Sequence, residues 1–190
     1  MAIKKLTIEE FLALAKEFPV LDVRSPGEYN HAHIPGAYSL PLFTDEERKV
    51  VGTTYKQKSR EDALELGLRY VGPKMAEFVQ TARQIAPSRR VAVHCWRGGQ
   101  RSASMAWLLR QAGMDVVVLE GGYKRYRKYV LEYLEVQQWQ LLVLGGRTGS
   151  GKTKILHTLH QMGEQIIDLH GKFEALFPRV KRFEIDNSDF

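Results

Sequence analysis

The sequence of 190 residues has a single cysteine, Cys95, and no long hydrophobic run. One cysteine cannot form an internal disulfide, so we expect a reduced thiol and a cytoplasmic location for the protein. A helix that spans a bilayer needs about 18 or more consecutive apolar residues, and we therefore expect no membrane partner. Internal repeats and low-complexity linkers are also lacking, so a domain boundary has to be inferred from the order of the predicted elements.

Positive charge is in excess. The 28 lysines and arginines outnumber the 22 acidic residues and give a formal net charge of +6. A basic protein favours anionic partners such as RNA, nucleotides and phosphate-bearing metabolites. Apolar residues make up 44% of the chain, which is enough for one hydrophobic core and part of another.

Short apolar runs alternate with segments of helical period along the first two thirds of the chain. Thr7 and Glu10 form a capping-box pattern that predicts a first helix. The alternation predicts an α/β fold with a mainly parallel sheet covered by helices on both faces. We predict strands near 19–25, 89–95 and 115–119, helices near 72–86, 102–113 and 123–136, loop and turn over 25–37, and a solvated helix and loop over 44–70.

A second strand, loop and helix begin after residue 136, with the strand expected in the apolar run 140–145. This restart predicts two domains, 1–135 and 136–190. The second is the beginning of a nucleotide-binding α/β domain, because only 37 residues follow Thr153 whereas a domain of this class typically needs about 150.

Cys95 lies in the stretch "HCWRGGQRS", which follows an apolar strand and precedes a helix. Gly98 and Gly99 allow this loop to curl so that its amides turn inward, and the helix dipole adds positive charge. Such surroundings raise the thiolate fraction, and they predict a nucleophilic Cys95 in an anion-binding loop. The loop residues expected to bind the substrate anion are Trp96, Arg97, Gly98, Gly99, Gln100 and Arg101. A merely packed cysteine is the alternative, and His94 is expected to pack rather than to catalyse.

The same stretch matches the pattern of cysteine-dependent phosphatases, in which the cysteine and Arg101 are separated by five residues. In that pattern the arginine binds phosphate oxygens through two hydrogen bonds. A phosphatase also needs a general acid, for which the sequence offers Asp45, Glu46 and Glu47 without placing any of them near the loop.

A second loop fits the phosphate-binding pattern G-x-x-x-x-G-K-[ST] and lies between the apolar run 140–145 and a helical segment. Its residues are Gly146, Arg147, Thr148, Gly149, Ser150, Gly151, Lys152 and Thr153. We expect its amides and Lys152 to bind phosphate groups, with Mg²⁺ at Thr153 if a nucleotide binds. Asp168 is a weak candidate for the metal-binding aspartate of such a domain. We predict no other metal site and no tightly bound cofactor.

The segment "YKRYRKY" at 123–129 places four cations among three tyrosines. Lys124, Arg125, Arg127 and Lys128 offer phosphate contacts, and the tyrosines offer stacking surfaces for RNA. Tyrosines three residues apart also pack against a core, so both interpretations stay open. Asp22 and Arg24 are expected to fix a strand end rather than to take part in chemistry.

Two segments resemble the rhodanese family. Residues 21–41, "LDVRSPGEYNHAHIPGAYSLP", are similar to its first motif, and residues 93–124 resemble its cysteine loop, helix and closing glycine pair. The resemblance implies a rhodanese-like fold in which Cys95 carries sulfur as a persulfide.

A rhodanese-type domain joined to the second loop resembles the bacterial tRNA 2-selenouridine synthase family over about residues 5–169, including the charged insertion at 51–68. The resemblance implies replacement of sulfur by selenium in 2-thiouridine at the tRNA wobble position, with selenophosphate and geranyl diphosphate as co-substrates. It further implies a Cys95-bound perselenide and a geranylated intermediate.

Beyond residue 169 the chain departs from the family pattern. We expect a truncated second domain, a Cys95 adduct that still forms, and weak or absent turnover on tRNA. A cysteine-dependent phosphatase and a nonenzymatic rhodanese-like binding module remain as alternatives, and the sequence predicts no oligomeric state.

Overall fold

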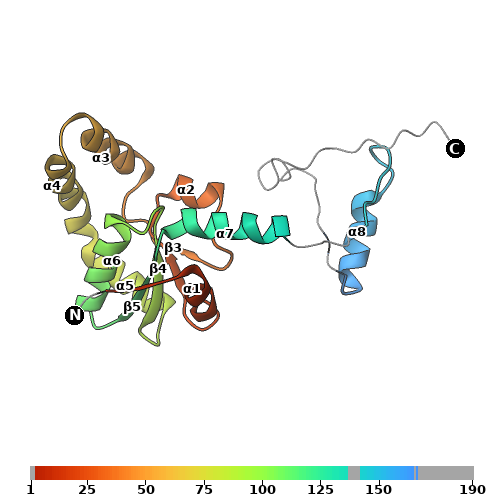
Figure 1. Cartoon of the computed structure of the whole chain (residues 1–190), viewed down its shortest axis with the longest axis horizontal. Coiled ribbons are helices and arrows are strands. Elements are labelled where there is room, and N and C mark those ends of the chain that lie inside the picture. Colours follow the sequence, from red (N-terminus) through yellow and green to blue (C-terminus); the bar gives the residue numbers. More distant parts are fainter. Residues whose placement is uncertain (1–2, 137–141, 165, 167–190) are drawn as a thin grey trace. The chain divides into compact units, whose positions relative to one another are not determined.

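The computed structural model describes residues 3–136, 142–164 and 166. The chain divides into two compact units, Met1–Gln137 and Gln138–Phe190. Figure 1 shows the strands gathered in the first unit and helix α8 in the second. None of the described helices is long and apolar enough to cross a membrane.

The first unit is built on a five-stranded parallel sheet in the order β1-β5-β4-β2-β3. The central strands β4 and β5 are apolar on both faces, as expected for a parallel sheet covered on both sides. This arrangement confirms the predicted α/β class. The strands are β1 (Lys4–Leu6), β2 (Val20–Asp22), β3 (Tyr38–Ser39), β4 (Arg90–His94) and β5 (Asp115–Leu119).

Helices cover both faces of the sheet (Figure 1). Each face has its own hydrophobic cluster. Along β5, Val116 and Val118 pack with α5 and α6, whereas Val117 and Leu119 pack with α1 and α7. This alternation follows from the opposite directions of successive strand side chains. The helices are α1 (Ile8–Leu14), α2 (Pro26–His31), α3 (Asp45–Gln57), α4 (Arg60–Val71), the 3₁₀ turn η1 (Gly72–Lys74), α5 (Met75–Ile85), α6 (Gln100–Gln111) and α7 (Gly122–Val136).

The structure corrects the prediction of loop and turn over 25–37, because α2 forms there. Ser25 precedes the helix, Pro26 occupies its first turn, and Glu28 accepts a hydrogen bond from the Ser25 amide at 3.1 Å. This reciprocal cap stabilises a helix of only six residues. The segment 44–70 forms the two capped helices α3 and α4, which are longer than the predicted helix and loop.

In the second unit, α8 (Lys152–Gln161) follows the second loop as predicted. The prediction of a strand over 140–145 is wrong for residues 142–145, which have no regular structure. Leu142 is 97% exposed, and no described residue pairs with this run, so it lacks the neighbouring strand that a parallel sheet requires. Residues 140 and 141, Asp168 and the tail 170–190 lie outside the described residues.

Candidate active site at the cysteine loop

The cysteine loop, residues 95–102, leaves the carboxyl end of β4 in the middle of the sheet. The first turn of α7 holds the start of this loop. The Tyr123 amide donates to the Cys95 carbonyl at 2.8 Å, and the Lys124 amide donates to the Trp96 carbonyl at 3.0 Å. The loop therefore lies at the carboxyl end of the parallel strands, where ligands commonly bind in open α/β sheets.

The Cys95 side chain is 3% exposed and borders the cluster under α5 and α6. Its sulfur is not surrounded by hydrocarbon alone, because Sγ lies 3.2 Å from the Ser102 hydroxyl. That hydroxyl also donates to the Gly99 carbonyl at 3.1 Å. A hydroxyl has one proton. Ser102 can therefore accept a hydrogen bond from the thiol or turn its proton toward a thiolate.

The backbone amides of residues 96–102 donate to no acceptor that the structure describes. Gly98 adopts a positive φ of 66°, which only glycine takes without strain, and Gly99 begins α6 without a side-chain cap. A curled loop with unused amides at a helix N-terminus can bind an anion.

Gly121 and Gly122 pack closely against the cysteine loop. Both have positive φ angles, and a Cβ on Gly122 would collide with the Cys95 carbonyl and the Gly98 amide. Backbone conformation therefore favours glycine at both positions, and close approach to the loop requires it at Gly122.

The two loop arginines have different surroundings. Arg101 forms an ion pair with Glu28 of α2 at 2.7 Å, and both side chains are largely buried. Arg97 is exposed and makes no ion pair with a described residue. Sequence reasoning missed Glu28, although its position three residues after Ser25 marked it as a helix cap.

The Glu28 carboxylate beside the loop is held in the ionised form. Burial tends to raise the pKa of Glu28, but the Arg101 hydrogen bond and charge, the Ser25 amide and the Arg48 charge outweigh it and lower the pKa to about 2.

Two of the three acids considered for a phosphatase, Asp45 and Glu47, are engaged by neighbouring groups. Lys74 and the Thr44 amide outweigh burial and lower the pKa of Glu47. Asp45 accepts hydrogen bonds from the Gly27 amide at 3.0 and 3.1 Å. A general acid needs a pKa near the working pH, so Glu47 is a poor proton donor and the phosphatase alternative loses support.

Behind the loop, Asp22 and Arg24 form a fully buried ion pair at 2.6 Å, and Arg24 also donates to the Ala32 carbonyl. The pair fixes the end of β2, as predicted. His94 is buried beside it, and burial lowers the pKa of His94 to about 4 against the opposing effect of the Asp22 charge. His94 is therefore neutral at pH 7, and its ring packs between Phe11 and Tyr123.

The four cations of α7 are not equivalent. Arg125 forms ion pairs with Glu9 and Glu132, and Lys128 with Glu132. Lys124 and Arg127 are exposed and make no ion pair within the described part of the chain. The tyrosines pack against the cluster under α1 and α7: Tyr123 is buried, and Tyr126 and Tyr129 are partly buried.

The second loop is exposed, and its glycines take the positive φ angles that such a loop requires. The Lys152 ammonium donates to the carbonyls of Gly146 and Arg147, both at 2.6 Å. A phosphate would have to compete with these carbonyls for the lysine.

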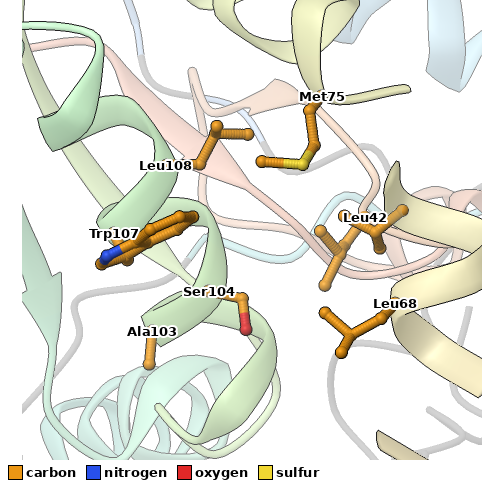
Figure 2. Close-up of a pocket in the computed structure, with 8 residues that line it drawn as sticks. Leu42, Leu68, Met75, Ala103, Ser104, Trp107 and Leu108 are labelled. Carbon is orange, nitrogen blue, oxygen red and sulfur yellow. The ribbon is translucent and has the colours of Figure 1, made fainter. Parts of the chain in front are cut away.

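A cavity of about 330 Å³ lies between α4, α5 and α6, and none of the cysteine loop residues 95–102 lines it (Figure 2). Leu42, Leu68 and Met75 face Ser104, Trp107 and Leu108 across it. Its lining includes no charged side chain, so it is not suited to an anion. Within the described residues, no group of three His, Cys, Asp or Glu side chains could hold a metal ion.

Several known proteins are similar to this chain in sequence, and solved structures are similar to it in fold. The tRNA 2-selenouridine synthase of Hydrogenovibrio crunogenus is 39% identical over 167 residues, covering 82% of this chain and 45% of the relative. That of Nitrosomonas europaea is 39% identical over 157 residues, covering 80% of this chain and 41% of the relative. The predicted resemblance is confirmed, and the chain spans less than half the length of these relatives.

Among solved structures, the N-terminal domain of a candidate ATP/GTP binding protein from Clostridium difficile 630 superimposes with a TM-score of 0.62 at 36% identity. The match covers 68% of this chain and 99% of that domain. The family model of the rhodanese-like domain matches residues 7–129, which include the whole cysteine loop and every strand of the sheet except β1. The chain therefore belongs to the rhodanese-like domain family.

Proposed function

We propose that this chain is a transferase of tRNA modification that carries selenium on Cys95 and delivers it to 2-thiouridine at the wobble position. The observation that carries the proposal is the cysteine loop, where a sulfur nucleophile lies beside a hydroxyl and a run of unused amides. The relatives named tRNA 2-selenouridine synthase support the choice of selenium and tRNA.

Loading begins with attack of the Cys95 thiolate on the selenium of selenophosphate. The S–Se bond forms and the Se–P bond breaks, and the electron pair of the Se–P bond leaves with phosphorus. The products are a Cys95 perselenide and phosphite, whose phosphorus takes up a proton from water as it leaves. The loop amides and exposed Arg97 would bind the trianionic donor and stabilise the charge that moves between selenium and phosphorus.

In the delivery step, the perselenide selenium attacks C2 of the uridine and expels the sulfur substituent. Geranylation of that sulfur, from geranyl diphosphate, makes it a neutral thioether and a better leaving group. A small thiol then attacks the Cys95 sulfur and breaks the S–Se bond, which leaves selenium on the uridine and a mixed disulfide on the protein. A second thiol restores Cys95.

We assign the second loop to a phosphate-bearing co-substrate, either a diphosphate or a nucleotide with Mg²⁺ at Thr153. The positive φ angles at Gly146, Gly149 and Gly151 support this assignment. Lys152 would exchange its two carbonyl contacts for phosphate oxygens.

Phosphorus NMR of selenophosphate mixed with the protein tests the loading step. We expect phosphite in a single-turnover amount with the native chain and none with Cys95→Ser. Release of phosphate alone would mean that water, not Cys95, attacks the donor, and it would contradict the carrier role.

A further inference from the structure

Trp96 is the residue directly after the nucleophile, and its side chain is 36% exposed. Its backbone is fixed, because its carbonyl accepts a hydrogen bond from the Lys124 amide at 3.0 Å and the preceding carbonyl accepts one from Tyr123. The Trp96 backbone is therefore held at the start of the cysteine loop, and its side chain is partly exposed there.

The indole has an aromatic support on one side. Its ring centroid lies 5.8 Å from that of Tyr123, with 32° between the planes. Tyr123 is itself immobilised, because the Arg24 guanidinium lies 3.9 Å from its centroid and Tyr126 packs at 5.7 Å. The support orders the indole and leaves part of it in contact with solvent.

Three exposed cations lie next to Trp96 in the loop or on the helix that binds its carbonyl, without an acidic partner among the described residues. Arg97 is next to Trp96 in the loop, and Lys124 and Arg127 lie at the start of α7, the helix that binds the Trp96 carbonyl. All three are exposed, and none forms an ion pair with a residue that the structure describes. The other two cations of this segment, Arg125 and Lys128, are both paired with Glu132.

An ordered, partly exposed aromatic ring with unpaired cations around it is the arrangement that binds an unpaired nucleotide. The base stacks on the ring, and the cations contact the phosphates on either side. We propose that Trp96 is the stacking platform for the acceptor base, and that Arg97, Lys124 and Arg127 bind the backbone of a single-stranded RNA segment at the mouth of the cysteine loop. This inference rests on the proposed function and names the residues that would receive its RNA.

The test measures binding of a fluorescein-labelled RNA hairpin with one unpaired 2-thiouridine in its loop, by anisotropy at fixed salt. A second hairpin lacks the base at that position but keeps its phosphates. We expect Trp96→Ala to raise the Kd for the first hairpin at least about fivefold, the effect of losing one stacked base, and to leave the Kd for the second unchanged. Trp96→Phe should restore most of the affinity.

Trp107→Ala is the matched control, because Trp107 is also an exposed tryptophan, at 53%, but lines the apolar cavity on α6. It should bind both hairpins like the native chain, and circular dichroism confirms that each variant is folded. The inference is overturned if the native chain does not bind the hairpin, if Trp96→Ala leaves Kd unchanged, or if it weakens both hairpins equally. Binding is measured without selenophosphate, so a failure of Cys95 loading leaves this result interpretable.

Discussion

The ion pair between Glu28 and Arg101 gives a stability prediction with a defined pH dependence. Its partners come from α2 and from the cysteine loop, and both side chains are largely buried. Arg101, Ser25 and Arg48 lower the pKa of Glu28 from 4.5 to about 2, despite the opposing effect of burial. Glu28→Gln removes the carboxylate charge while keeping the size of the side chain.

The lowered pKa of Glu28 sets the size of the expected change in stability. A lowering of roughly 2.5 corresponds to about 3 kcal/mol of folding free energy at pH 7, because each pKa unit is about 1.4 kcal/mol. The pair is partly accessible to water, so we expect Glu28→Gln to lower the free energy of unfolding by about 1–3 kcal/mol at pH 7.

The sign follows from the direction of the shift. A carboxyl whose folded pKa is depressed stabilises the protein above its unfolded pKa of 4.5, and this contribution is lost as the pH falls toward 2. The native chain should therefore be more stable than Glu28→Gln at pH 7, and the difference should shrink steadily below about pH 4.5.

Urea unfolding followed by circular dichroism at several pH values between 7 and 3 measures this difference. Glu65→Gln is the matched control, because Glu65 forms an ion pair with Arg69 in which both side chains are more than two-thirds exposed, and it should change stability little. A difference between native and Glu28→Gln that is the same at pH 7 and pH 3, or absent at pH 7, would refute the reasoning.

The structure predicts the effects of four further substitutions. Gly122→Ala should lower the free energy of unfolding by at least about 2 kcal/mol, because the residue has a positive φ and the new Cβ collides with the loop. Gly52→Ala is the control, because Gly52 lies in α3 with open space around it, and it should raise the free energy of unfolding by about 0.5–1 kcal/mol in the same urea assay. Asp22→Asn should lower the free energy of unfolding by about 3–5 kcal/mol, because it leaves the buried Arg24 without a counter-charge, and a smaller effect would contradict the role of the pair. Ser102→Ala should slow iodoacetamide alkylation of Cys95 at pH 7 severalfold in a folded protein, since it removes the hydroxyl beside the sulfur. An unchanged alkylation rate would show that this contact has no influence on the thiolate.

Much of the first unit was predictable from the sequence. The strands around β4 and β5 and the helices α5, α6 and α7 have long apolar patterns of a single period, and the structure confirms them. The edge strands β1 and β3 have only three and two residues, which is too short for a period to be recognised. Helix α2 was missed because "SPGEYNHAHIPGA" was interpreted by its proline and glycines rather than by its capping residues.

The cysteine loop was predictable in its residues but not in its electrostatics. The spacing of Cys95, the glycines and Arg101 is local, and the sequence contains it directly. Glu28 lies 73 residues before its partner Arg101, so their pairing depends on the packing of α2 against the loop. The same limit applies to α7, where pairing with Glu9 and Glu132 decides which cations remain available.

At 140–145 the local sequence pattern is that of a strand, but the strand does not form over the described residues. Its apolar residues match a buried strand, but a strand forms only where a neighbour can accept its hydrogen bonds. Leu142 and Val143 are 97% and 78% exposed, and no pairing partner lies among the described residues. A correct local pattern therefore did not predict the local structure.

The central claim is that the Cys95 sulfur accepts selenium from an anionic donor bound by its own loop. Intact-mass analysis of the folded chain after incubation with selenophosphate, followed by peptide mapping, tests it most directly. We expect a mass increase of one selenium atom, located on the peptide that contains Cys95 and absent from Cys95→Ser. A native chain that stays unmodified while folded, or selenium that remains bound to Cys95→Ser, would contradict it.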